Sequence, residues 1–492
     1  METEHRLNDV RRGYRALLRN PAFCTLLGAE VLLRLGQSIL LTTLPWLLLD
    51  LTGSNSSVGW ATAAVFSPYL LAAIPAGALV DRVERRLLMP AVTFVSALLA
   101  AAVPVLHATR ALAAWNVLLI AFLLSTSILL FQLGRSSILP QIVAREALVT
   151  ANAAQVVLTG LAAICGNALV GPLVQAMGLA NSFAFHAAFM LLSAGLLTRL
   201  ALPTTGAPAR DLARLRPADV FEGLAYARQD RLIRSIFVLD ALYFVVADGL
   251  LMTGIPLFVK DVLGAGPEVY SYTRIAGNVG MLLGALWLGQ FGRGLSKGRV
   301  IVAGWLGYGL ALLLYPLGRS LTAALAASFL ASLCGNLIPA SGRSLLQERV
   351  PPEILGRVFG LWAIVAPGAG TVSAVLASAL ASALPSTALI AVGAAVACGN
   401  AFLGRQSGLW GGAYGGRSRL LAPRGSHHAA RHMGPASQPP AVACSTKWRQ
   451  DPIFTVPPLS CTRSPARDSV WLSSRTAANR SRSLHRSGSM SQ

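Results

Sequence analysis

The chain has 492 residues, of which 54% are hydrophobic and 12% charged, with a formal net charge of +21 and a mean hydropathy of +0.59. A soluble protein cannot bury so large an apolar share, so the composition excludes a chain made only of soluble domains. Charged residues gather in short clusters, separated by nearly charge-free intervals of about 20 residues, the length of an α-helix that crosses a hydrocarbon core. Backbone groups in lipid must pair within their own segment, so we predict an all-α integral membrane protein.

In chain order, we expect a cytoplasmic N-terminal lead-in at 1–21, a six-helix half at 22–200, a cytoplasmic linker with an amphipathic surface helix at 201–233, a second six-helix half at 234–403, and a basic disordered tail at 404–492. The fifth and sixth spans are the hardest to separate. The twelve expected transmembrane helices lie near 22–49, 57–80, 87–107, 112–133, 150–176, 180–200, 234–258, 269–291, 299–317, 320–341, 358–381 and 384–403.

The distribution of basic residues predicts the orientation. With the N-terminus inside, the cytoplasmic loops hold 23 Lys and Arg, whereas the opposite side holds only Arg110, Lys260 and Arg319. We therefore expect a multi-pass protein of the cell (cytoplasmic) membrane with both termini cytoplasmic. Residues after position 404 carry 13 Lys and Arg against two acids, so this tail supplies +11 of the net charge. The basic balance thus requires no nucleic-acid partner.

The two halves contain matching segments at equivalent places. "GALVDRVERRLLM", which starts at Gly77 after the second span, has its counterpart in "GQFGRGLSKGRVI", which starts at Gly289 after the eighth. "GRSSILPQIVAREAL" from Gly134 follows the fourth span and matches "GRSLLQERVPPEIL" from Gly342 after the tenth. Two matches offset by roughly half the chain predict two pseudo-symmetric six-helix halves related by an axis along the membrane normal.

On these residues, the sequence resembles a transporter of the major facilitator superfamily. The segment between the second and third spans fits the superfamily signature G-x-x-x-D-R-x-x-R-[RK], although Glu84 stands where the family often has glycine. "LTGSNSSVG", "SILPQIVAREALVTANA", "VFEGLAYARQDRLIR" and "QERVPPEILGRVFG" resemble the bacterial efflux branch, which includes macrolide and siderophore exporters. The resemblance covers roughly residues 15–403.

The resemblance implies a conformational latch, which closes the cytoplasmic side when the carrier faces outward. Its residues are Gly77, Asp81, Arg82, Arg85 and Arg86. The absent side chain of Gly77 would let a neighbouring helix approach closely, and Asp81 can pair with Arg85 one turn on. The alternative is a topology signal whose arginines are solvated.

Ionisable residues within spans are costly in lipid and are therefore functional candidates. We expect them to serve proton coupling or to line the substrate cavity, because desolvation favours a neutral carboxyl and a nearby arginine favours a charged one. A structural Glu30–Arg34 pair and a helix-packing role for Asp240 are the alternatives. The candidates are Glu30, Arg34, Gln37, Asp240, Asp248 and Arg274.

Two further patterns accompany the spans. "GNALVGPLVQAMG" resembles an antiporter signature through Gly171 and Pro172, without its full glycine spacing, and small-residue packing at a proline kink is the alternative. Trp46, Trp60 and Trp115 lie near the expected outer interface, where we expect them to anchor the helices.

These features predict a secondary active transporter, not an enzyme, that exports amphipathic small molecules of the drug or macrolide type against protons. A dedicated siderophore or natural-product exporter and a non-transporting receptor or scaffold stay open as alternatives. We expect no cofactor and no metal, a proton gradient as the energy source, membrane lipid and a small-molecule substrate as partners, and a monomer. The tail is either a functional segment or an out-of-frame extension, because nothing in the family resemblance accounts for it.

Overall fold

The computed structural model describes residues 17–144, 147–200 and 225–410, which form helices and connecting turns without any strand. Most of the expected lead-in, linker and tail lies outside these residues. The first half contains α2 (Pro21–Thr52), α3 (Ser56–Leu71), α4 (Ala73–Arg82), α5 (Arg85–Ala108), α6 (Ala114–Ile142) and α7 (Leu148–Leu197). The second half contains α9 (Arg231–Leu242), η2 (Tyr243–Asp248), α10 (Gly249–Asp261), α11 (Pro267–Phe291), η3 (Gly292–Gly294), α12 (Lys297–Leu312), α13 (Leu314–Gly318), α14 (Leu321–Arg349), α15 (Pro352–Leu380) and α16 (Ser386–Gln406).

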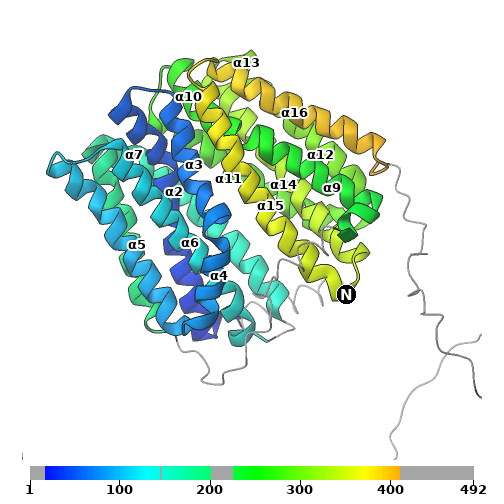
Figure 1. The fold of residues 1–492 in the computed structure, drawn as a ribbon, viewed down its shortest axis with the longest axis horizontal. Coiled ribbons are helices and arrows are strands. Elements are labelled where there is room, and N and C mark those ends of the chain that lie inside the picture. Colours follow the sequence, from blue (N-terminus) through cyan, green and yellow to red (C-terminus); the bar gives the residue numbers. More distant parts are fainter. Residues whose placement is uncertain (1–16, 145–146, 201–224, 411–492) are drawn as a thin grey trace, which may run out of the picture. The chain divides into compact units, whose positions relative to one another are not determined.

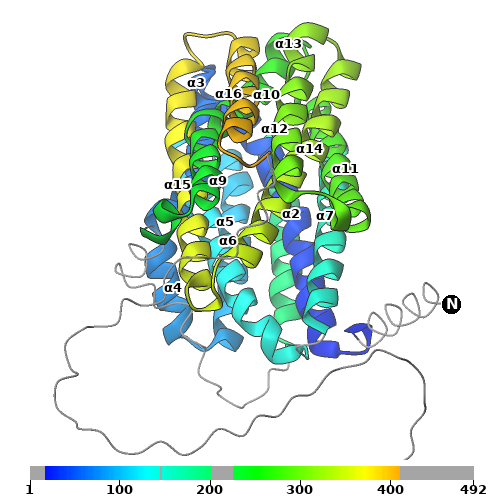
Figure 2. The same cartoon turned by 90° about the vertical axis from the view of Figure 1, so that its right-hand side faces the viewer.

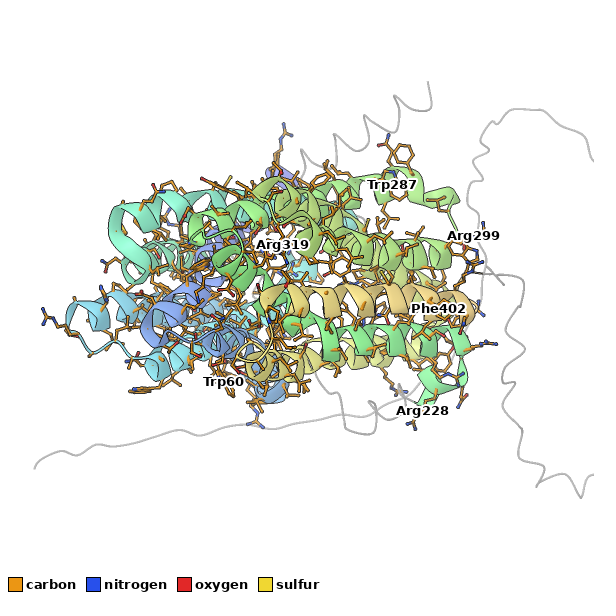
Figure 3. All side chains as sticks on the ribbon, turned by 90° about the horizontal axis from the view of Figure 1, so that it is seen from above. Trp60, Arg228, Trp287, Arg299, Arg319 and Phe402 are labelled. Atoms are coloured by element: carbon orange, nitrogen blue, oxygen red, sulfur yellow. The ribbon has the colours of Figure 1, made fainter. Side chains whose placement is uncertain are left out.

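The described helices have the length and composition of membrane spans. Eight helical segments are long and apolar enough to cross a bilayer; one of them, Arg231–Asp261, joins α9, η2 and α10, and another, Lys297–Gly318, joins α12 and α13. The outer surface of the bundle is apolar as well, and the exposed Trp60, Trp287 and Phe402 project from it in Figure 3. Because soluble monomers rarely expose so many large apolar side chains, the fold is an all-α integral membrane bundle.

The α7 helix contains the expected fifth and sixth spans, which meet at Gly178 (φ 82°, ψ 173°). The hydrogen bonds between α7 and α2 show that the chain reverses direction at Gly178. The residue numbers of the α2 partners rise along α7 before Gly178 and fall after it. The hydrogen-bonded pairs, in order along α7, are Gln155–Glu30, Asn167–Thr42, His186–Gly36 and Ser193–Ala29. The twelve-span count stays a prediction, which the two limbs of α7 favour.

The two halves share apolar contacts at one end of the bundle. We call this the Asn55 end, after the residue that precedes α3, and the opposite end the Arg82 end, after the last residue of α4; α13 and α4 lie at these two ends in Figure 2. In Figure 1 the first-half helices, blue to cyan, lie to one side of the second-half helices, green to orange. Leu49 and Val58 of the first half share a buried cluster with Leu257 and Ala377 of the second.

At the Arg82 end, each half has its own core. One cluster contains Phe23, Phe131 and Leu197 of the first half, and a separate one contains Ile236 and Leu346 of the second. Among the described residues, therefore, the buried apolar clusters that join the halves are those nearer the Asn55 end.

One expectation about aromatic anchors is wrong. Trp60 and Trp115 are exposed, at 49% and 69%, whereas Trp46 is buried and packs with Val259 and Tyr270 of the second half. A position near the end of a span is compatible with both a lipid-exposed and a buried tryptophan. The buried residues that pack against Trp46 are more than 200 positions away in the sequence. Trp46 is a contact between halves rather than a lipid anchor.

Candidate transport site

Glu30 on α2 forms a polar network with Gln155 and Arg135. The amide of Gln155, on the first limb of α7, donates a hydrogen bond to Glu30 Oε1 at 2.6 Å. Arg135 on α6 lies 3.6 Å from the same oxygen, measured from Nε, and also donates to the amide oxygen of Gln155. Glu30 therefore has a cation and an amide donor from two other helices around it.

Arg34, the cation expected near Glu30, interacts with it electrostatically, but the ion pair within 4 Å is formed by Arg135. Arg34 donates to Gln37 Oε1 at 2.7 Å and has an exposed side chain. It interacts electrostatically with Glu30, with Arg274 of the second half and with Tyr69. Arg34 and Gln37 thus belong to a polar surface that faces the second half. The ion-pair partner of Glu30 is Arg135, which lies beyond the expected end of the fourth span.

Arg274 lies on α11 and completes this surface from the other half. Its guanidinium donates to the hydroxyl of Tyr270 at 3.4 Å and lies 5.8 Å from the centre of that ring. Tyr69 on α3 accepts a long hydrogen bond from Gln132 at 3.5 Å. Such accessible polar groups inside a membrane bundle are suited to contact with water or with a polar ligand.

The two acids of the seventh span both face α15, as their spacing predicts. Asp240 is buried and accepts a hydrogen bond from Trp362 Nε1 at 3.0 Å. Asp248 is also buried, and a Cβ atom added to Gly370 would lie 3.4 Å from its Oδ2. The partners on α15 are eight residues apart, as the acids are, because the two helices run parallel.

The seventh span contains a π-helical turn, η2, which ends at Asp248. A wider turn of this kind leaves backbone groups without their usual partner, and here the N–H of Gly249 donates to Ser373 Oγ at 2.9 Å. Phe66 of α3 lies 3.7 Å from the same Gly370 position that Asp248 approaches. Asp248 therefore lies where α3 of the first half meets α15 of the second.

A tyrosine pair that no sequence pattern indicated lies beside this turn. The hydroxyls of Tyr243, which begins η2, and Tyr308 on α12 are 2.7 Å apart. Trp305 and Phe244 pack on the ring of Tyr243. A tyrosine in an apolar span does not by itself indicate a functional pair. In the structure, both hydroxyls interact electrostatically with Asp248.

Polar contacts close the Asn55 end between the halves. Lys260 Nζ donates to Asn55 Oδ1 at 2.8 Å, and Ser378 Oγ donates to the carbonyl of Ser56 at 2.7 Å. A side chain at Gly59 would overlap the backbone of Ser378, so α3 and α15 approach closely there. The bundle in this structure is held shut at the Asn55 end.

The expected latch segment lies at the opposite end. The α4 helix ends at Arg82, and α5 begins at Arg85. A Cβ at Gly77 would meet no described atom within 4 Å, so none of the described residues packs closely against this glycine in this conformation. The side chain of Asp81 lies outside the described residues, and its pairing with Arg85 stays a prediction.

The antiporter-like pair lies on α7, where the two halves meet. A Cβ at Gly171 would lie 3.3 Å from Cβ of Glu268, in the first turn of α11, so this glycine permits close packing between the halves. Pro172 lies within the same helix.

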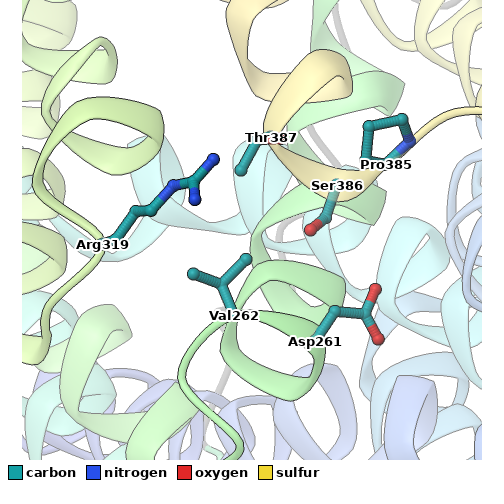
Figure 4. A pocket seen from close by; sticks show the side chains of 6 residues that line it. All are labelled: Asp261, Val262, Arg319, Pro385, Ser386 and Thr387. Carbon is teal, nitrogen blue, oxygen red and sulfur yellow. The ribbon is translucent and has the colours of Figure 1, made fainter.

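An open cavity of about 450 Å³ lies at the Asn55 end of the second half (Figure 4). Its lining residues are Asp261, Val262, Arg319, Pro385, Ser386 and Thr387. Its only charged lining residues, Asp261 and Arg319, are of opposite sign. No group of acids, histidines and cysteines in the described ranges could hold a metal ion.

Two repeated sets of apolar helices, with charged side chains between them, define a membrane transporter of the major facilitator class. The chain belongs to the transmembrane secretion effector family, whose sequence profile matches residues 13–409. It is accordingly a multi-pass membrane transporter and not an enzyme.

Characterised relatives are efflux proteins. The multidrug efflux pump Tap of Mycolicibacterium fortuitum is 28% identical over 356 residues, which cover 71% of this chain and 86% of that protein. Macrolide efflux protein A of Streptococcus pyogenes is 24% identical over 350 residues, or 69% and 84% of the two chains.

Solved transporters share the fold. The nucleoside transporter NupG superposes with a TM-score of 0.62 at 13% identity, over 78% of this chain and 98% of that one. A bacterial homologue of the iron transporter ferroportin, in an inward-facing state, gives 0.58 at 16% identity, over 80% and 99%. At this identity the likeness defines the fold alone.

Proposed function

We propose that this protein is a secondary active exporter that exchanges amphipathic small molecules of the drug or macrolide type for protons by alternating access. The observation that carries the proposal is the Glu30 network, in which a carboxylate inside a membrane helix is held by an amide and an arginine from two other helices. The efflux activities named for the two relatives support export.

The sidedness of the proposal follows from the basic residues. The 23 Lys and Arg of the inner loops, against three on the other side, favour a cytoplasmic Arg82 end and an outward Asn55 end. In this orientation both termini are cytoplasmic, and the protein resides in the cytoplasmic membrane. The contacts at Lys260 and Ser378 then close the outer side, so the structure represents an inward-facing conformation.

Glu30 is the proposed proton carrier. When the outer side is open, a proton from the exterior binds the Glu30 carboxylate and converts it to a neutral acid, which no longer attracts Arg135. In the inward-facing conformation the proton passes to cytoplasmic water, and the carboxylate regains the ion pair at 3.6 Å. The proton gradient thereby favours one direction of the conformational cycle.

The substrate binds between the halves in this proposal. Arg34, Gln37 and Arg274 supply polar groups there, and Asp248 lies at the contact of α3 and α15. Phe66 supplies an apolar face near the same point. Such a mixture is suited to amphipathic molecules, for which apolar area contributes affinity and a few polar groups determine orientation.

Gly77, Asp81, Arg82, Arg85 and Arg86 form the proposed latch of the outward-facing conformation. The open space beside Gly77 is consistent with a latch that is released while the Asn55 end is closed. In the other conformation a helix of the second half would occupy that space. Gly171 permits the close packing of α7 and α11 on which the outer closure depends.

Transport into everted vesicles tests the proposal. Their lumen corresponds to the cell exterior, so an acidic lumen should drive uptake of labelled macrolides, and of dyes in the same panel, at several times the rate without a gradient. Selective uptake of siderophores would favour the dedicated exporter. Folded protein that takes up none of these compounds would contradict export and favour the receptor alternative.

A further inference from the structure

The second half contains a counterpart of the Glu30 network. Asp240 on α9 accepts a hydrogen bond from Trp362 Nε1, and the guanidinium of Arg343 on α14 lies 5.2 Å from the centre of the Trp362 ring. An acid, a bridging side chain and an arginine therefore follow one another, as Glu30, Gln155 and Arg135 do in the first half.

The repeat relates the two sets residue by residue. Arg135 and Arg343 occupy the second position of the matched "GRS" segments, 208 residues apart. Both acids are nine residues from the first residue of their helix, Pro21 for Glu30 and Arg231 for Asp240, or about 14 Å along the axis at 1.5 Å per residue. The acids lie on the first span of each half, the arginines on the fourth and the bridging residues on the fifth.

The bridging side chains differ, but they connect the same groups. Gln155 accepts from Arg135 and donates to Glu30, whereas Trp362 presents its ring face to Arg343 and its N–H to Asp240. An aromatic face attracts a guanidinium, so the Trp362 side chain contacts the cation through its ring and the acid through its N–H. Trp362 thus connects the arginine with the acid in the second half, as Gln155 does in the first.

The surroundings of Asp240 come from several elements. The polar group that contacts it is Trp362 on α15, and the charged group beyond that ring is Arg343 on α14. The π-helical turn η2, which starts at Tyr243, begins three residues after Asp240. Asn400 on α16 donates to the carbonyl of the preceding Leu239 at 2.9 Å rather than to the acid.

We propose that Asp240, Trp362 and Arg343 form a second proton-carrying site, so that one transport cycle exchanges two protons for one substrate molecule. The inference rests on the proposed exchange function. A proton from the exterior binds Asp240 Oδ2, and the resulting neutral acid loosens its bond with Trp362. The proton leaves to cytoplasmic water as the carboxylate forms again. Arg343 and Trp362 are positioning residues for this step.

Infrared difference spectroscopy of the full-length protein in lipid, titrated from alkaline to acidic pH, tests the site without any substrate. We expect Asp240→Asn to remove one titrating carboxyl band and Glu30→Gln to remove another. Trp362→Phe keeps the ring beneath Arg343 but lacks the N–H donor, so it should shift the frequency of the Asp240 band alone. Glu348→Gln, at an exposed acid near the Arg82 end, is the matched control: it should remove the signal of a water-exposed carboxyl and leave the Asp240 and Glu30 bands in place. An unchanged carboxyl spectrum in folded Asp240→Asn would overturn the proposal.

The proton stoichiometry tests the exchange, with erythromycin as the probe in proteoliposomes. At the membrane potential and pH gradient that just halt net erythromycin flux, the proton and erythromycin gradients balance, and the ratio of the two gives the number of protons exchanged per molecule. We expect two protons for the wild type and one for Asp240→Asn. A value of one for the wild type, or two for both proteins, would overturn the second site while the proposed function stands. Erythromycin flux by the wild type that ignores the proton gradient would overturn the proposed function itself.

Discussion

Lys260 Nζ donates a hydrogen bond to Asn55 Oδ1 at 2.8 Å, and this bond joins the two halves of the chain at the Asn55 end. Lys260 is one of only three basic residues on the expected outer side. Its neighbour Asp261 lies 3.7 Å away, so the ammonium is held between a residue of the other half and an acid of its own helix. The bond requires a conformation in which the Asn55 end is closed.

Lys260→Met should destabilise the conformation in which the Asn55 end is closed. The side chain is 39% exposed, so the lost bond is worth about 1 kcal/mol or less, which is up to about a fivefold change in the ratio of the two conformations. Distances between spin labels across the Asn55 end should show a larger open fraction. Lys297→Met, at the ion pair with Glu348 near the other end, should leave that fraction unchanged.

Gly59→Leu should prevent the Asn55 end from closing, because its side chain would overlap the backbone of Ser378. We expect folded protein that stays open at this end and has lost at least tenfold in transport rate. Gly160→Leu is the control, since a Cβ there meets no described atom within 4 Å. Equal transport by the two variants would mean that the close approach of α3 and α15 is dispensable.

Arg135→Gln should uncouple transport from the proton gradient. The substitution leaves Glu30 without its cation, which changes the balance between its charged and neutral forms by roughly 2 kcal/mol. Gradient-driven uptake should fall about tenfold or more, and Arg135→Lys should restore part of it. Arg299→Gln, at an exposed arginine of α12, is the control. Normal coupling in Arg135→Gln would contradict the assigned role.

Deletion of residues 411–492 should leave transport intact. The family profile ends at residue 409, and the proposed site lies entirely on helices before that point. Uptake per folded molecule should match that of the full chain, with membrane insertion checked by immunoblot. Loss of activity in inserted protein would favour the scaffold alternative, in which the basic tail recruits partners.

Much of the fold could be predicted from apolar runs and loop charges, because both reflect the bilayer directly. The predicted fourth and tenth spans end near 133 and 341, whereas α6 continues to Ile142 and α14 to Arg349. These extensions contain Arg135 and Arg343, which therefore looked like loop residues. Arg135 contacts Gln155 and Glu30, and Arg343 contacts Trp362, but hydropathy alone cannot separate such residues from a solvated loop.

The composition of the site was less predictable. Spacing within one helix identified Arg34 as a neighbour of Glu30, since it reports only groups one turn apart. The ion-pair partner of Glu30, Arg135, lies 105 positions away in the sequence, on α6. The repeated "GRS" was a usable signal, because it singled out both arginines at equivalent positions. The π turn at Tyr243–Asp248 and the Tyr243–Tyr308 pair left no comparable pattern.

The most direct measurement of the central claim compares two transport modes of Glu30→Gln in the same proteoliposomes. Counterflow, in which labelled macrolide exchanges with unlabelled macrolide, needs no net proton movement, whereas gradient-driven uptake does. We predict that Glu30→Gln retains counterflow within about twofold of the wild type and loses gradient-driven uptake, while Glu348→Gln retains both. Gradient-driven uptake by Glu30→Gln at the wild-type rate would contradict proton exchange through this carboxylate.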